Sequence, residues 1–228
     1  MDWQARSKIL LGADCAARLA DKCVLIVGVG GVGGYALETV VRCGVGNITI
    51  VDGDVFDETN LNRQLLATRA NIGKSKADAG AKRAKEINPD IAVTAINARF
   101  NDGTAEEIFA AGYDYVIDCI DSIRDKVLLI EKTHALNIPC ISALGAANRL
   151  DTDFEVTDIS RTHSDGLARA VRKQLRERGI EKHKVVCSVS PCLQTADGAL
   201  GSVAFPPAVC GIIVGKEVII DLLQGDKT

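Results

Sequence analysis

One stretch decides the fold: Lys22-Cys-Val-Leu-Ile-Val-Gly28-Val-Gly-Gly-Val-Gly-Gly34. Its first half is a short, continuous apolar run rich in β-branched residues, which is typical of a strand buried on both faces of a parallel sheet. Its second half satisfies G-x-G-x-x-G and leads into a helical segment, so backbone N–H groups at a helix N-terminus can approach phosphate oxygens. The candidate phosphate-binding glycines are Gly28, Gly30, Gly31 and Gly33.

Strand and helix patterns alternate on both sides of this stretch. A helix with a break at Gly12 is expected within residues 1–20, and residues 21–150 are expected to form a doubly wound, Rossmann-like core with a mainly parallel sheet. Its further strands are expected at 47–52, 91–96, 113–118 and 138–142, and its further helices at 35–43, 73–88, 105–111 and 122–136. Residues 151–228 are expected to add an α+β extension that completes one domain spanning 1–228. It holds a strand at 154–159, a basic helical segment, a strand at 185–189 and an apolar helix from 206 to about 223.

The composition excludes several classes of protein. The chain has 228 residues, of which 47% are apolar and 25% charged, with a net charge of −3, which is ordinary for a globular protein and unlike a disordered or collagen-like chain. The first residues lack the features of a signal peptide, and no apolar run is as long as a membrane span, so we expect a cytoplasmic protein without a membrane partner. The eight cysteines include no CxxC pair, which argues against a structural zinc site.

The residues that follow the second strand distinguish between nucleotide sites. Asp52 ends that strand, where an acid can bind ribose hydroxyls, and up to this point an NAD-dependent dehydrogenase fits equally well. Several cationic and amide side chains then follow, which a hydride-transfer site does not need but which can surround a triphosphate. A carboxylate at the end of strand 113–118 suits Mg²⁺. These residues occur as Asp52-x-Asp54, Asn60-x-x-Arg63-Gln64, Gly73-x-x-Lys76 and Asp118-x-x-Asp121.

Together with the glycine loop, these motifs make residues 6–145 resemble the ThiF/MoeB-like adenylating domain. That domain is shared by ubiquitin-activating enzymes and by the sulfur-carrier-activating proteins of molybdopterin and thiamine synthesis. The resemblance implies that Asp52 holds the ribose of ATP and that Asp121 holds Mg²⁺. It further implies a homodimer, in which Arg6 of one chain reaches the site of the other. The residues implied to hold the nucleotide are Asp52, Asp54, Asn60, Arg63, Gln64 and Lys76, and those implied in catalysis are Arg6, Arg63, Lys76 and Asp121.

Later motifs narrow the resemblance. Phe154–Ser160, the basic segment, Lys184–Val186 and Gly201–Pro206 are similar to the tRNA threonylcarbamoyladenosine dehydratases. This similarity implies ATP-dependent dehydration and cyclisation of N6-threonylcarbamoyladenosine in tRNA through an acyl-adenylate. It also implies a cysteine desulfurase as a sulfur-transfer partner and a bound Na⁺ or K⁺ ion. Adenylation of the C-terminus of a small sulfur-carrier protein, or a non-catalytic nucleotide-binding module, remain as alternatives.

The basic segment carries the chain's concentration of positive charge. Residues 161–184 hold eight basic and three acidic residues, a net charge of +5, while the remainder of the chain carries −8. A segment of this kind suits the phosphate backbone of RNA, although a solvated amphipathic helix has the same pattern. The candidate RNA-binding residues are Arg169, Arg172, Lys173 and Arg176. Cys187 follows this segment, and both a thioester-forming thiol and an ordinary, partly buried one fit its position.

Overall fold

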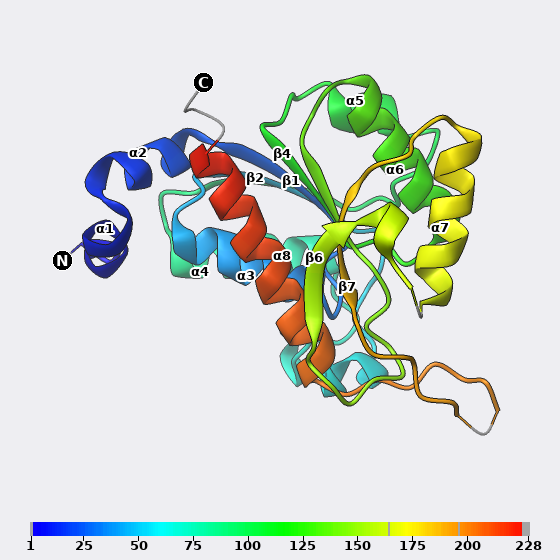
Figure 1. The fold of residues 1–228 in the computed structure, drawn as a ribbon. Coiled ribbons are helices and arrows are strands. Elements are labelled where there is room, and N and C mark those ends of the chain that lie inside the picture. The colour runs from blue at the N-terminus through cyan, green and yellow to red at the C-terminus, as the bar shows by residue number, and fades with distance from the viewer. Residues whose placement is uncertain (1, 164, 196, 225–228) are drawn as a thin grey trace.

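A seven-stranded sheet forms the centre of the computed structural model, which describes residues 2–163, 165–195 and 197–224 (Figure 1). The strand order is β3-β2-β1-β4-β5-β7-β6, and every neighbouring pair is parallel except β6 with β7. The order reverses between β1 and β4, as in doubly wound nucleotide-binding sheets, so the predicted fold class is confirmed. The strands are β1 Cys23–Val27, β2 Asn47–Val51, β3 Ala92–Ile96, β4 Tyr115–Asp118, β5 Cys140–Ala143, β6 Phe154–Asp158 and β7 Lys184–Ser188.

Helices cover both faces of the sheet. Helices α3, α4 and α8 pack on one face, and α5, α6 and α7 pack on the other (Figure 1). Successive side chains of a strand point to opposite faces, and in β1 Val24 and Ile26 join the first layer whereas Leu25 and Val27 join the second. The helices are α1 Ala5–Leu11, α2 Ala13–Asp21, α3 Gly33–Cys43, α4 Lys76–Ile87, α5 Ala105–Phe109, α6 Ile123–Ala135, α7 Gly166–Glu177 and α8 Phe205–Gln224.

Several element boundaries differ from the sequence expectation because of local capping. The N-terminal segment breaks at Gly12, as expected, where φ is +90°, and it forms the two helices α1 and α2. Helix α4 begins at Lys76 rather than at residue 73, because the Ser75 hydroxyl caps it by accepting the Asp78 N–H at 3.1 Å. The basic helix is shorter than expected and spans only α7, because the Asp165 carboxylate caps its first turn.

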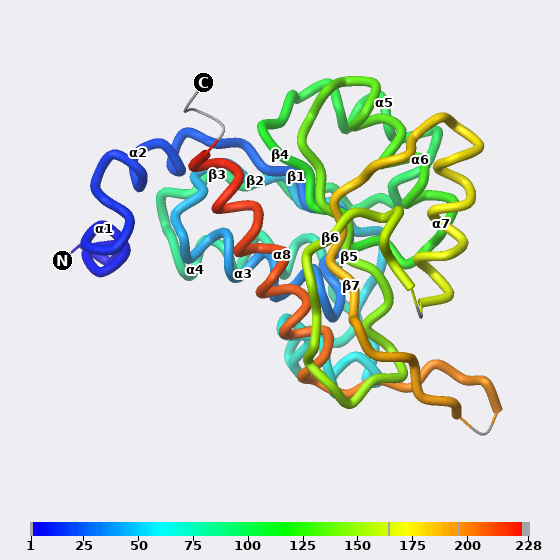
Figure 2. The backbone as a smooth tube through the Cα atoms, in the orientation of Figure 1, coloured from blue at the N-terminus to red at the C-terminus, as the bar shows by residue number. Residues whose placement is uncertain are grey.

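The C-terminal third completes the same sheet rather than standing apart. Strands β7 and β6 extend the sheet beyond β5, and α8 returns across it to lie along α3, as the tube in Figure 2 shows. Two glycines of α8 make this close crossing possible: Gly211 lies against Val32 and Tyr35, and Gly215 against Thr39. In the described part of the chain no helix, α8 included, is both long and apolar enough to cross a membrane.

The α3–α8 crossing predicts that Gly211→Ala destabilises the protein. The added methyl group would overlap the Val32 carbonyl oxygen, so the helices must separate, and we expect the free energy of unfolding to fall by about 1–3 kcal/mol. Gly166→Ala is the matched control, because no atom lies within 4 Å of the added methyl group. Urea denaturation of both variants measures the difference, and equal stabilities would contradict this account of the crossing.

Candidate active site

The glycine loop closes tightly at the carboxyl end of β1. Gly28 has φ +87°, and a side chain there would lie 2.8 Å from the Cys119 carbonyl oxygen. A side chain on Gly33 would overlap the Gly28 carbonyl oxygen, so α3 begins directly against the end of the strand. Gly30 lies beside the Gln64 amide, and Gly31 beside Pro207 of α8. The loop therefore brings its backbone N–H groups to the N-terminus of α3, where a phosphate group is favoured.

Asp52 joins the glycine loop to the end of β2. Its Oδ2 accepts the Val29 N–H at 2.8 Å, and its Oδ1 accepts the Asp54 N–H at 2.9 Å. Each carboxylate oxygen retains capacity for another donor. The half-buried carboxylate is therefore fixed in orientation and still able to accept hydroxyl groups.

Lys76 and Asp54 lie together beside this loop, and Arg99 joins them. Lys76 Nζ lies 3.2 Å from Asp54 Oδ2, and Arg99 Nη2 lies 3.1 Å from Asp54 Oδ1. Partial burial opposes ionisation of Asp54, but Lys76 and Arg99 outweigh it and hold the pKa of that carboxyl below its usual value. The Lys76 side chain is 10% exposed, so its ammonium group is held at the site edge rather than free in solvent. The sequence did not indicate Arg99, which follows β3 and packs across Gly53.

Asn60, Arg63 and Gln64 lie on or just after a 3₁₀ helix, Glu58–Asn62, which the sequence did not predict. Asn60 is buried, and its side chain completes a capping box with Asp57. Arg63 donates through Nη1 to the Thr59 carbonyl oxygen at 2.9 Å. Gln64 is buried beside Gly30, and its Oε1 has no hydrogen-bond partner among the described residues. A buried polar atom left unpaired next to a phosphate-binding loop fits a site that a ligand completes.

The two acids after β4 have different environments. Asp121 is exposed in the turn before α6, and none of the described residues donates to its carboxylate. Asp118 is fully buried and bonded to Lys126, so it cannot reach a ligand. Cys119 and the Ile120 nitrogen lie against Gly28, so the turn that leads to Asp121 starts beside the glycine loop. Mg²⁺ commonly takes one or two carboxylates together with phosphate oxygens and water, so Asp121 fits that ion. No cluster of three or more metal-binding side chains occurs in the described residues.

Arg6 is not brought to the site of its own chain. Its neighbour Gln4 packs against Gly44, at the end of α3 opposite to Gly33. The length of the 11-residue α3, about 16 Å, therefore separates the start of α1 from the glycine loop. Figure 1 shows α1 projecting away from the orange end of α8, which lies beside the loop.

The candidate RNA-binding residues lie along α7, but one of them is already bonded within the protein. Arg169, Lys173 and Arg176 are exposed. Arg172 is half-buried and donates through Nη1 to the Thr162 carbonyl oxygen at 2.6 Å and to the Thr162 hydroxyl at 2.7 Å. Arg172 therefore holds the segment before α7, and three of the four residues present their charge to solvent.

Cys187 lies in the interior of the sheet rather than in the site. It belongs to β7 and is 2% exposed, and burial, with Glu155 and Asp165 adding to it, raises the pKa of its thiol to about 11. A thiol in this state is a poor nucleophile. The environment favours the ordinary buried thiol over the thioester-forming one. Cys192 is exposed, in the segment between β7 and α8.

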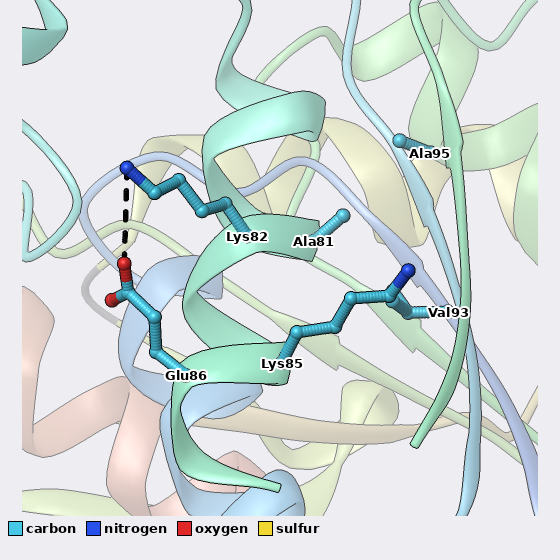
Figure 3. A pocket seen from close by; sticks show the side chains of 6 residues that line it. All are labelled: Ala81, Lys82, Lys85, Glu86, Val93 and Ala95. Carbon is cyan, nitrogen blue, oxygen red and sulfur yellow. Dashed lines mark ion pairs between the residues drawn. The ribbon is translucent and has the colours of Figure 1, made fainter. Parts of the chain in front are cut away.

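The shallow groove in Figure 3 lies elsewhere, between α4 and the edge strand β3. Its lining consists of Ala81, Lys82, Lys85, Glu86, Val93 and Ala95. None of the predicted site residues lies in it, and Lys82 is paired with Glu86 across one turn of α4. The chemistry of this protein therefore belongs at the carboxyl ends of the strands, as it does in doubly wound folds generally.

A buried polar network that the sequence did not indicate lies beneath this site. Asp118 Oδ2 accepts the Lys126 ammonium group at 2.8 Å and the Ser142 hydroxyl at 2.6 Å, and Ser142 Oγ lies 2.8 Å from His183 Nε2. Since the hydroxyl has one proton and gives it to Asp118, it must accept the hydrogen of His183 Nε2. Burial, with His134 and Lys126 adding to it, lowers the pKa of the imidazole to about 3, so the ring is neutral at neutral pH.

The fold and the glycine loop thus define the class as an α/β protein of the nucleotide-phosphate-binding type. The ThiF family model matches residues 4–226, and the chain belongs to the ThiF family. It is 38% identical to the tRNA threonylcarbamoyladenosine dehydratase of Bacillus subtilis over 96% of this chain and 94% of that protein. It is 36% identical to the molybdopterin-synthase adenylyltransferase of Escherichia coli, over 71% of this chain and 63% of that one.

Solved structures of one relative agree with this assignment over the whole fold. The tRNA N6-threonylcarbamoyladenosine dehydratase of Escherichia coli in complex with AMP superposes with a TM-score of 0.93, and its ATP complex with 0.92. In both comparisons the identity is 31%, and the alignment covers 99% of this chain and 97% of the other. The C-terminal third of this chain is included in that match.

Because His183 is buried and neutral, we predict that acidification lowers the free energy of unfolding. The folded pKa of about 3 lies below the ordinary value of 6.5, so between these values the unfolded chain binds a proton that the folded chain does not. Stability is full above the upper value and falls as pH drops, by about 1.4 kcal/mol per pH unit from this residue. Urea titrations across this range should give a smaller slope for His183→Gln, and an unchanged slope would contradict the assignment.

Proposed function

We propose that this chain dehydrates N6-threonylcarbamoyladenosine in tRNA, with ATP as the activating substrate. The observation that carries the proposal is the glycine loop bonded to Asp52 and packed against the turn that precedes Asp121, with the Lys76–Asp54 pair following Asp52. The similarity to two bacterial dehydratases over nearly the whole chain supports it. We further propose that residues 1–228 act as one adenylating domain with 21–150 as the nucleotide-binding core. The sheet shared by the core and the extension supports that division.

The reaction needs two steps at one site. The carboxylate of the threonylcarbamoyl group attacks the α-phosphorus of ATP, which forms an acyl-adenylate and releases pyrophosphate. An atom of the carbamoyl group then attacks the acyl carbon, closes the ring and releases AMP, which carries away the carboxylate oxygen. The attacking atom of the carbamoyl group belongs to the same side chain as the activated acyl carbon. Its effective concentration is therefore high, and no protein nucleophile is needed. This agrees with the burial of Cys187.

The protein's part is to bind, orient and neutralise charge. Asp52 is placed to accept ribose hydroxyls, and the glycine loop offers backbone N–H groups to the phosphates. Lys76 can move from Asp54 to a phosphate oxygen, because Arg99 stays to neutralise Asp54. Gln64 lies beside Gly30, where its unpaired Oε1 can accept a hydroxyl or amino group of the nucleotide, and Asn60 holds that segment in shape. Arg63 lies beside Gly31 and adds a positive charge. Such fixed charges stabilise the transition state of phosphoryl-group chemistry.

Mg²⁺ would be held by Asp121 and by phosphate oxygens, and it would supply charge neutralisation to the triphosphate. A bound Na⁺ or K⁺ ion remains a prediction from the family resemblance, with no residue assigned to it. A cysteine desulfurase partner is likewise predicted from the resemblance, and a cytoplasmic location stays a prediction from the sequence of the first residues.

The tRNA is proposed to lie along α7, held through its phosphate backbone. Arg169, Lys173 and Arg176 present positive charge there, and the chain has only nine aromatic residues for stacking on bases. Such backbone contacts make binding strongly dependent on salt.

Adenylation of a small sulfur carrier remains the second candidate, favoured by the identity to the molybdopterin-synthase adenylyltransferase. The two functions share the first chemical step and differ in the acceptor. ATP–pyrophosphate exchange separates them: the proposal expects exchange that requires threonylcarbamoylated tRNA. Exchange that requires a carrier protein and ignores the tRNA would favour the alternative.

The assignment of Asp121 predicts a large loss of rate in Asp121→Ala. Single-turnover dehydration of threonylcarbamoylated tRNA should slow by about a hundredfold or more. The variant cannot hold the metal ion whose positive charge would offset the negative charge that accumulates on the phosphates. Asp90→Ala, which removes an exposed carboxylate before β3, is the control and should keep the wild-type rate. A wild-type rate in Asp121→Ala would remove the metal role proposed for this residue.

The distance of Arg6 from its own glycine loop predicts complementation between chains. Arg6→Ala and Asp121→Ala should each be nearly inactive alone. After unfolding and refolding together, they should regain about a quarter of the wild-type rate, because half of randomly mixed two-fold dimers hold one intact site of two. Mixtures as inactive as the separate variants would show that Arg6 does not act across a dimer.

A further inference from the structure

The buried network beneath the site reaches the turn that carries Asp121. We propose that Asp118, together with Lys126 and Ser142, is a positioning residue that fixes this turn so that Asp121 meets the phosphates and their metal ion. The inference rests on the metal role proposed for Asp121, gives Asp118 of the same motif a role, and adds Lys126 and Ser142, which lie outside the motifs.

Asp118 contacts the turn directly. Asp118 Oδ1 accepts the Ile120 N–H at 3.0 Å, one residue before Asp121. On the other side, the Cys119 N–H donates to the Val27 carbonyl oxygen at 2.9 Å, and the Cys119 carbonyl oxygen lies against Gly28. The turn is therefore held between the buried carboxylate and the glycine loop. These two contacts together fix the distance between the turn and the backbone of the glycine loop.

The Asp118 carboxylate is itself held in place by buried donors. Its Oδ2 accepts Lys126 of α6 and Ser142 of β5, and the same ammonium group donates to the Ala143 carbonyl oxygen at 3.0 Å. One carboxylate thus ties together the ends of β4 and β5 and the first turns of α6. Because every one of these groups is buried, the arrangement is not loosened by competing water.

Burial of the Asp118–Lys126 pair has an energetic cost. Asp118 and Lys126 are both 0% exposed, and removing two charges from water costs so much that an apolar pair of similar size often serves stability equally well. Stability therefore gives no sufficient reason for this pair. Placement of the turn does, because a carboxylate can accept from Ile120, Lys126 and Ser142 at once, which an apolar side chain cannot do.

The test compares ATP affinity with Mg²⁺ and with EDTA, measured by titration calorimetry in the absence of tRNA. The variant Asp118→Ala/Lys126→Met removes both charges together, so it leaves no unpaired buried charge. We expect the gain in ATP affinity due to Mg²⁺ to fall about tenfold, as it does when groups that orient a metal ligand are removed, while affinity in EDTA stays within about twofold. Ser142→Ala keeps the ion pair and should show a smaller loss, which provides a test if the double variant does not fold.

Tyr115→Phe is the matched control. Tyr115 begins the strand that Asp118 ends, and it donates to Asp221 at 2.6 Å at the far end of the sheet, so its loss should weaken the fold without changing the Mg²⁺ effect. If Asp121→Ala loses the Mg²⁺ effect while the folded network variants keep it, the positioning role is overturned. If Asp121→Ala itself keeps the effect, the metal role falls and the positioning role falls with it. Neither result depends on whether the acceptor is tRNA.

Discussion

The close approach of α3 to the end of β1 is the constraint on which the rest of the structure depends. Neither Gly28 nor Gly33 has room for a side chain, because each lies against backbone of a neighbouring segment. This contact exposes the amide groups of the loop at a helix N-terminus, where phosphate groups bind. It also brings Cys119 against the loop, and α8 against its outer side through Pro207. A larger residue at either glycine would move the phosphate site and the metal-binding turn at the same time.

Parallel strands then gather the chemistry at one edge. The ends of β2 and β4 lie on either side of the end of β1, so Asp52 and Asp121 come from opposite sides to the same loop although 69 positions separate them in the chain. Of the charges at the site, those on Lys76 and Arg63 would pair with a triphosphate, and that on Asp121 would pair with its metal ion. The inward charges, on Asp118 and Lys126, neutralise each other. The site therefore has a polar surface that binds and a polar interior that holds its shape.

The sequence predicted the alternation of strands and helices and the doubly wound, mainly parallel sheet, because glycine spacing and apolar runs are local signals. It predicted neither the 3₁₀ helix under Asn60 nor the ends of α4 and α7, which depend on capping by Ser75 and Asp165. Arg99, Arg172 and the Asp118–Lys126 pair could not be assigned either, because their partners lie 8 to 45 positions away, and only folding decides which carboxylate or carbonyl oxygen they meet. A charge count along the chain treats Arg172 and Arg169 alike, whereas the structure half-buries Arg172 and exposes Arg169.

The most direct test of the account is mass spectrometry of tRNA nucleosides after incubation with the protein, ATP and Mg²⁺. The account predicts that threonylcarbamoyladenosine loses the mass of one water, that one AMP and one pyrophosphate appear for each modified nucleoside, and that nothing changes without ATP. An unchanged nucleoside, while the same preparation adenylates the C-terminus of a sulfur-carrier protein, would contradict it.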